Sequence, residues 1–168
     1  VFGGAARNIG DPKGCSLDGF AYQHFNHTPR SASELPEGWQ ITETQPEDLQ
    51  ELAGFYEHMA GGLMLDALDL RPEKIDCTDL SGEYTKLGLT RQRHLYSLKS
   101  NGQLKAVFLV NQSDIGLNLS DITNCVKAFV TDSQDFSADI FQAAIAKIAK
   151  ITAKKDFPIL IYPAAYAD

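Results

Sequence analysis

The segment from Asn124 to Pro163 limits the possible folds most, because its pattern changes from strand to helix and back to strand. Cys125–Val130 has the β-branched and aromatic content of a strand. From about Ser137, apolar residues recur at helical spacing: Ile140, Phe141, Ala144, Ile145, Ile148 and Ile151. A second apolar run, Phe157–Tyr162, follows. The simplest arrangement is a parallel pair of strands joined by a crossover helix.

Length and charge exclude several classes of protein. The chain has 168 residues, 43% of them hydrophobic, which suffices for one principal domain with a sizeable core. Its 22 acidic and 15 basic residues give a formal net charge of -7. Because no dense basic cluster is present, nucleic acid is not expected as a partner. The apolar runs are far shorter than the ~20 residues that cross a bilayer, so we expect no membrane span.

The cysteines and histidines indicate the compartment and the absence of a metal site. Three widely spaced cysteines, Cys15, Cys77 and Cys125, fit neither a disulfide framework nor a zinc-binding pair. This usage favours a reducing, cytoplasmic setting, with Cys125 buried and inert in a strand. His24 and His27 have no evident third ligand nearby, so no metal site is predicted.

The chain divides into three parts. Residues 1–28 form an N-terminal segment that fits the tail of a preceding module, because Val1 is not a methionine and no leader pattern follows it. Residues 29–38 have the proline content of a linker. Residues 39–168 form the main domain. Within the first part, Gly19–Phe25 alternates like an edge strand, and we expect it to pair beside Ile159–Tyr162.

The first half of the main domain contains a strand followed by helices. Trp39–Glu43 alternates apolar and polar residues, as a strand with one buried face does. A helix begins next, with Pro46 in its first turn, and four apolar residues follow on one face: Leu49, Leu52, Tyr56 and Met59. Short helices are predicted at Leu63–Leu70 and Asp79–Leu87.

A β-hairpin is the clearest local signal. Its strands are His94–Lys99 and Gln103–Val110. They are joined through Asn101-Gly102, a dipeptide that favours the positive φ angles of a tight turn. Since Ala106–Val110 is apolar on both faces, we expect it to be a central strand.

The predicted fold class is therefore α/β (α+β), with a mixed central sheet and the order strand, helix, helix, hairpin, strand, helix, strand. This order resembles the GNAT superfamily of acyl-CoA-dependent N-acyltransferases. The stretch Trp39–Leu49 looks like the first strand and capped first helix of that fold. The resemblance covers Trp39–Tyr162 and places residues 39–168 in a GNAT-like domain. It implies that the two late parallel strands splay and leave a V-shaped cleft for an acyl-pantetheine arm.

The resemblance also implies a cofactor site at the mouth of that cleft. The cofactor would be acyl-CoA, either acetyl-CoA or a longer acyl form, and its pyrophosphate would lie at the start of the long helix. The implied binding residues are Phe129, Val130, Thr131, Gln134, Ser137 and Ala138. The superfamily places glycines in this connection, whereas this chain has Ser137 and Asp139 there, together with Asp132 and Asp135. These carboxylates would repel an anionic ligand, and the other interpretation is that they cap the helix.

The resemblance implies that a tyrosine protonates the leaving thiolate. Tyr162 and Tyr166 are the candidates, since they stand at the end of the last strand. Three polar residues near the hairpin are candidates to face the cleft: Glu83, His94 and Asp114. Met64 and Leu65 are candidates for the acceptor side. Each of these residues also has a purely structural interpretation, as a packing or surface residue.

Two functions follow. The first is an N-acyltransferase that moves an acyl group from an acyl-CoA-type thioester to a small-molecule or peptide amine. The second is a catalytically degenerate GNAT-like module that serves ligand sensing or contacts other domains of a longer chain.

Overall fold

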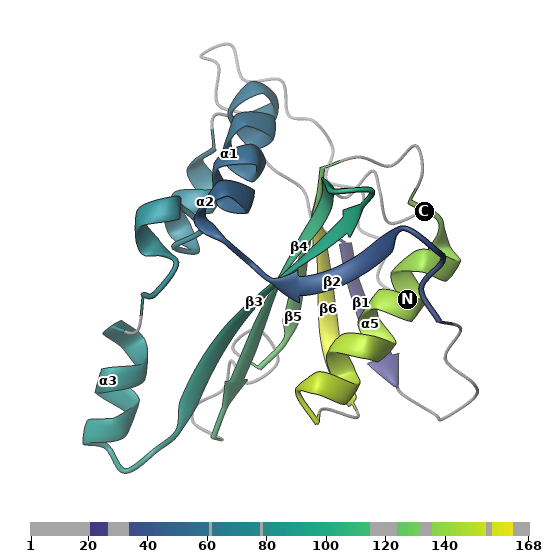
Figure 1. Ribbon diagram of the computed structural model, residues 1–168. Coiled ribbons are helices and arrows are strands. Elements are labelled where there is room, and N and C mark those ends of the chain that lie inside the picture. Colours follow the sequence, from purple (N-terminus) through teal and green to yellow (C-terminus); the bar gives the residue numbers. More distant parts are fainter. Residues whose placement is uncertain are drawn as a thin grey trace.

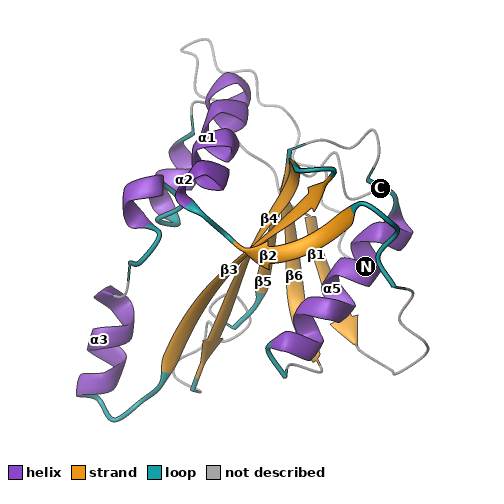
Figure 2. Cartoon of the chain, viewed as in Figure 1, coloured by secondary structure: helices purple, strands orange, loops and turns teal. Residues whose placement is uncertain are grey.

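The computed structural model describes residues 21–26, 34–60, 62–77, 79–114, 124–131, 136–153 and 156–162. Its strands are β1 (Ala21–Asn26), β2 (Trp39–Glu43), β3 (Arg91–Ser100), β4 (Gln103–Ser113), β5 (Val126–Val130) and β6 (Asp156–Tyr162). Its helices are α1 (Pro46–Ala60), α2 (Leu63–Ala67), the 3-10 turn η1 (Pro72–Lys74), α3 (Asp79–Lys86) and α5 (Ala138–Ile151). The strands form one six-stranded sheet in the order β1-β6-β5-β4-β3-β2 (Figures 1 and 2). The predicted mixed α/β class is confirmed.

The predicted strand-helix-strand unit is also confirmed. β5 and β6 pair in parallel, from Val126↔Ile159 to Phe129↔Tyr162, and α5 connects them. The other four strand pairings are antiparallel. Ser137 is the N-cap of α5, and its hydroxyl oxygen accepts a hydrogen bond from the Ile140 amide at 3.4 Å.

Helices cover both faces of the sheet. On one face, α5 packs through Ile145 and Ile148 against strand residues such as Phe108 and Ala128. On the other face, α1 packs through Leu49 and Leu52 together with α2 (Figure 1). Alternation along each strand therefore sends successive side chains into two separate cores.

The N-terminal segment contributes the strand that was expected from it. β1 pairs antiparallel with β6, from Ala21↔Ile161 to Asn26↔Asp156. Gly19 and Phe20 lie outside the described residues. Because of this pairing, the edge of β6 that faces away from β5 is covered.

The β3–β4 hairpin turns where the sequence predicted. Asn101 and Gly102 both have positive φ, 49° and 84°, as a tight hairpin turn requires. Both strands are longer than predicted, because pairing continues from Arg91↔Ser113 through polar residues that lack the apolar signature of a strand. A register shift lies between Leu98 and Lys99.

The α1 helix begins as predicted, but α2 is shorter. The Asp48 carboxylate accepts the Gln45 amide hydrogen at 3.1 Å and pairs with the Lys99 ammonium at 2.6 Å, which fixes the first turn of α1. α2 was expected to reach Leu70 but ends at Ala67. It stops there because Asp69 adopts a left-handed φ of 54°.

Candidate functional site

The predicted cleft corresponds to the carboxyl ends of β5 and β6. The described ladder between these strands ends at Phe129↔Tyr162, and residue 163 is a proline, which has no amide hydrogen for a further rung. The Tyr56 hydroxyl, from α1, donates to the Tyr162 carbonyl oxygen at 2.9 Å and lies 3.4 Å from the Val130 carbonyl oxygen. A side chain from α1 therefore bridges the two strands where they would begin to separate. We call this place the fork: Tyr56, Phe129, Val130 and Tyr162.

Aromatic rings close the α1 side of the fork. The Phe129 and Tyr162 rings are stacked, with centroids 5.0 Å apart and an interplanar angle of 3°. Tyr56 meets Phe129 edge-on at 6.2 Å. All three side chains are buried. Burial raises the pKa of Tyr162 to about 12, with a further contribution from Cys125. Tyr162 thus holds its proton tightly and lies inside packed side chains.

The other predicted cofactor residues make contacts within the fold. The Thr131 hydroxyl donates to the Leu104 carbonyl oxygen at 3.0 Å. Ser137 and Ala138 are exposed at the start of α5. Gln134 and the second predicted catalytic tyrosine, Tyr166, lie outside the described residues, as do Asp132 and Asp135.

The polar candidates Glu83 and Asp114 make their contacts outside the fork, whereas Leu65 belongs to the same buried cluster as Tyr56, Phe129 and Tyr162. Glu83 is exposed on α3 and pairs with Lys86 at 2.6 Å. The Asp114 carboxylate accepts the Thr90 amide hydrogen at 2.7 Å. Leu65 is buried in the core between α1 and the sheet, and Met64 packs against that core.

The described part of the chain contains no group of three or more residues that would hold a metal ion. The side chains of His24 and His27 lie outside the described residues.

Two buried lysines were not foreseen from the sequence. The Lys127 ammonium donates to the Cys125 sulfur at 3.3 Å, and both side chains are buried, as predicted for Cys125. Lys105 is 5% exposed. Both lysines stand in apolar runs that predict core strands. A single polar residue in such a run does not show whether its side chain is buried.

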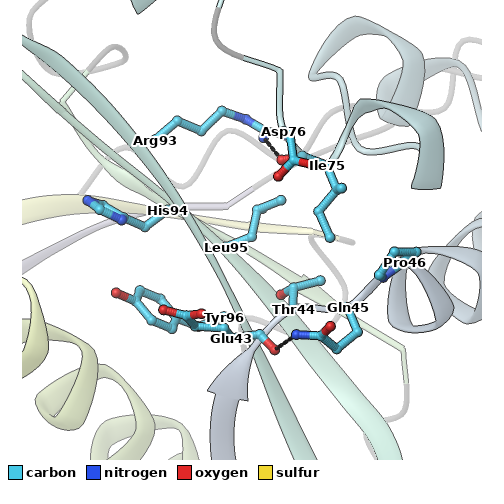
Figure 3. A pocket seen from close by; sticks show the side chains of 10 residues that line it. All are labelled: Glu43, Thr44, Gln45, Pro46, Ile75, Asp76, Arg93, His94, Leu95 and Tyr96. Carbon is cyan, nitrogen blue, oxygen red and sulfur yellow. Dashed lines mark hydrogen bonds between the residues drawn. The ribbon is translucent and has the colours of Figure 1, made fainter.

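A pocket of ≈ 480 Å³ lies elsewhere, at the open edge of β3 (Figure 3). We call it the edge pocket, and its lining residues come from the end of β2, the start of α1, the loop after η1, and β3: Glu43, Thr44, Gln45, Pro46, Ile75, Asp76, Arg93, His94, Leu95 and Tyr96. His94 was a sequence candidate; the others were not. The pocket forms because β3 is longer than β2. This difference in length can be recognised only when the register of the two strands is known.

Two kinds of charge face the edge pocket. The Arg93 guanidinium donates to the carbonyl oxygens of Asp69 and Ile75, at 2.7 and 3.1 Å. Burial lowers the pKa of Arg93. Glu43 and Asp76 are exposed carboxylates, and within the described ranges neither forms an ion pair.

Tyr96 and His94 add an aromatic wall. Their rings are stacked with centroids 6.3 Å apart. Burial raises the pKa of Tyr96, and the Glu43 carboxylate adds to this effect. The Tyr96 side chain and Glu43 thus lie close together on one side of the pocket (Figure 3).

No helix in the described ranges has both the length and the apolar character needed to cross a membrane. Comparison with known proteins adds no relative: the chain matches no protein-family model, and no curated sequence resembles it significantly.

Proposed function

We propose that residues 39–168 form a GNAT-like domain whose acyl-thioester slot is closed, and that the domain acts by binding and not by acyl transfer. The architecture supports the likeness: a first strand and capped helix, a hairpin, and a late parallel pair with its crossover helix. In this proposal the module serves ligand sensing or contacts with other domains of a longer chain. The widely spaced cysteines support a cytoplasmic setting.

The observation that carries the closed slot is the position of Tyr56. Its hydroxyl bridges the Tyr162 and Val130 carbonyl oxygens, the groups that lie where a pantetheine arm would enter between separating strands. Removing this hydroxyl from the fork would cost the Tyr162 carbonyl oxygen its hydrogen bond of 2.9 Å from Tyr56. A thioester must therefore compete with a contact that the fold already satisfies.

A second candidate is the N-acyltransferase itself, with acetyl-CoA or a longer acyl-CoA as donor and a small-molecule or peptide amine as acceptor. It is favoured by the single parallel pair, because the connection after β5 leads to the start of α5, where an anionic group is attracted by backbone amides. In this candidate Tyr56 moves away on binding, Tyr162 or Tyr166 serves as the acid, and Phe129 to Ala138 hold the cofactor.

Isothermal titration with acetyl-CoA and with a longer acyl-CoA separates the two candidates. For the closed module, we expect no binding by the natural chain at ~1 mM ligand, which corresponds to about -4 kcal/mol or weaker. Micromolar binding, about -8 kcal/mol, would refute the closed slot and support the enzyme. The Tyr56→Phe variant sharpens the test: if the hydroxyl keeps the fork shut, its removal strengthens binding, whereas Tyr84→Phe on α3 leaves it unchanged.

A further inference from the structure

The edge pocket exists because β2 ends before it reaches the beginning of β3, which runs in the opposite direction. The last β2–β3 pair is Glu43↔Tyr96, and one more backbone bond follows, from the Thr44 amide to the Leu95 carbonyl oxygen at 3.1 Å. β3 itself begins at Arg91. The part of β3 from Arg91 to His94 thus has β4 on one side and no described strand on the other.

The alternation of backbone groups along β3 shows which N–H and C=O groups point away from β4. Because the Leu95 carbonyl points toward β2, and residues two apart in a strand point the same way, Arg93 and Arg91 present their N–H and C=O groups to the open side. No described residue pairs with these groups by a backbone hydrogen bond. An open edge of this kind accepts another strand.

The side chains around the edge differ on the two faces of the sheet. Glu43, His94 and Tyr96 lie on the α5 side, as Tyr96 belongs to that core. Arg93 and Asp76 lie on the α1 side, where the Arg93 guanidinium is held by carbonyl oxygens (Figure 3). A strand added here would place successive side chains on alternate faces.

We propose that this edge binds an extended peptide, paired antiparallel to β3 at Arg91–Arg93, with a lysine or arginine of the peptide placed against the Glu43 carboxylate. The peptide continues the line of β2, and its backbone supplies most of the affinity. This site is separate from the fork, and the inference does not depend on whether the fork admits a thioester.

Charge decides the kind of peptide. The Glu43 carboxylate is exposed at the pocket, and an exposed carboxylate attracts a cation by charge-assisted hydrogen bonding. Asp76 adds a second carboxylate, while the Arg93 guanidinium keeps its charge but already donates to two backbone carbonyl oxygens. The net charge of -7 also favours a basic partner.

The test uses a fluorescein-labelled peptide of alternating threonine and valine with one central lysine, followed by fluorescence anisotropy. We expect saturable binding that weakens about tenfold, or ~1.4 kcal/mol, in the Glu43→Gln variant. Glu47→Gln, an exposed carboxylate in the first turn of α1, is the matched control and leaves binding unchanged. A peptide with N-methylated amides on its pairing side should not bind.

Several results would overturn the inference: no binding at ~1 mM peptide, equal binding by a peptide with central glutamate, or equal binding by the N-methylated peptide. Light scattering over a range of protein concentrations checks whether a second copy of the chain occupies the edge. Concentration-dependent dimerisation that Glu43→Gln abolishes would also count against the peptide. Tyr56→Phe should bind the peptide as the natural chain does, so a failure here is distinct from a failure at the fork.

Discussion

The two ends of α1 meet the sheet in opposite ways. At Pro46 the helix borders the edge pocket, where the carboxylates of Glu43 and Asp76 are exposed. At Tyr56, ten residues later and about 15 Å along the helix axis, it presses a hydroxyl and a ring into the fork. The fork is thus packed, whereas the edge pocket lies beside the start of α1, where the sequence predicted only a strand and a capped helix. A fold class predicted from element order does not locate a usable surface.

The largest expected effect is at the closed end. Phe129→Ala removes a fully buried ring that contacts both Tyr56 and Tyr162, and we expect a loss of about 3–5 kcal/mol in the free energy of unfolding, measured by urea denaturation. Leu63→Ala, at a residue 75% exposed, is the control and should stay within about 0.5 kcal/mol of the natural chain. Similar losses in the two variants would show that the fork is not packed.

Tyr56→Phe tests the hydroxyl alone. The ring remains, but the Tyr162 carbonyl oxygen loses its donor at 2.9 Å, so we expect the free energy of unfolding to fall by about 1–3 kcal/mol in the same urea titration. If the variant is as stable as the natural chain, the hydroxyl does not hold the two strands together.

The raised pKa of Tyr162 makes the stability of the folded chain depend on pH in the alkaline range. Because its pKa is about 12 in the folded chain, compared with 10.0 as the ordinary value, the folded state keeps a proton that the unfolded state has lost between these values. This contribution to stability is fully present below pH 10 and is lost as the pH rises through about 12. Urea midpoints measured across this interval should fall less steeply in Tyr162→Phe; an unchanged slope would mean that Tyr162 does not titrate as described.

The smallest effect is expected at the open end. The Glu43 carboxylate is exposed and forms no ion pair with a described residue, so Glu43→Gln should change the free energy of unfolding by no more than about 0.5 kcal/mol. Asp48→Asn, in the first turn of α1, is the contrast. We expect it to lower the free energy of unfolding more than Glu43→Gln does, because the Asp48 carboxylate is buried and pairs with Lys99. Equal stability losses in the two variants would contradict the distinction between a solvent-facing pocket wall and a helix anchor.

Much of the fold was predictable because local chemistry determined it. Asn101-Gly102 specified its turn, Pro46 began a helix, and the apolar run at Ala106–Val110 became a central strand. The pairing of the N-terminal segment with β6 also followed from alternation and a bare edge.

The sites were not predictable, since they depend on distances between residues far apart in sequence. Tyr56 was correctly placed on the buried face of α1, but nothing in the helical spacing shows that its hydroxyl reaches two strand ends. The edge pocket needs the β2–β3 register, which leaves β3 longer than its neighbour. Lys127 reads as a surface residue until both faces of β5 are covered.

Because β1 pairs with β6, the sheet can be completed only late in the synthesis and folding of the chain. A ribosome delivers β1 before the other described strands, while its register partner β6 emerges after all of them. Contacts of such long sequence separation form slowly. A strand that waits with its hydrogen-bonding groups open is exposed to wrong partners in the meantime. The chain therefore passes through a vulnerable stage during synthesis, which a circular permutant that places β1 directly after β6 would shorten.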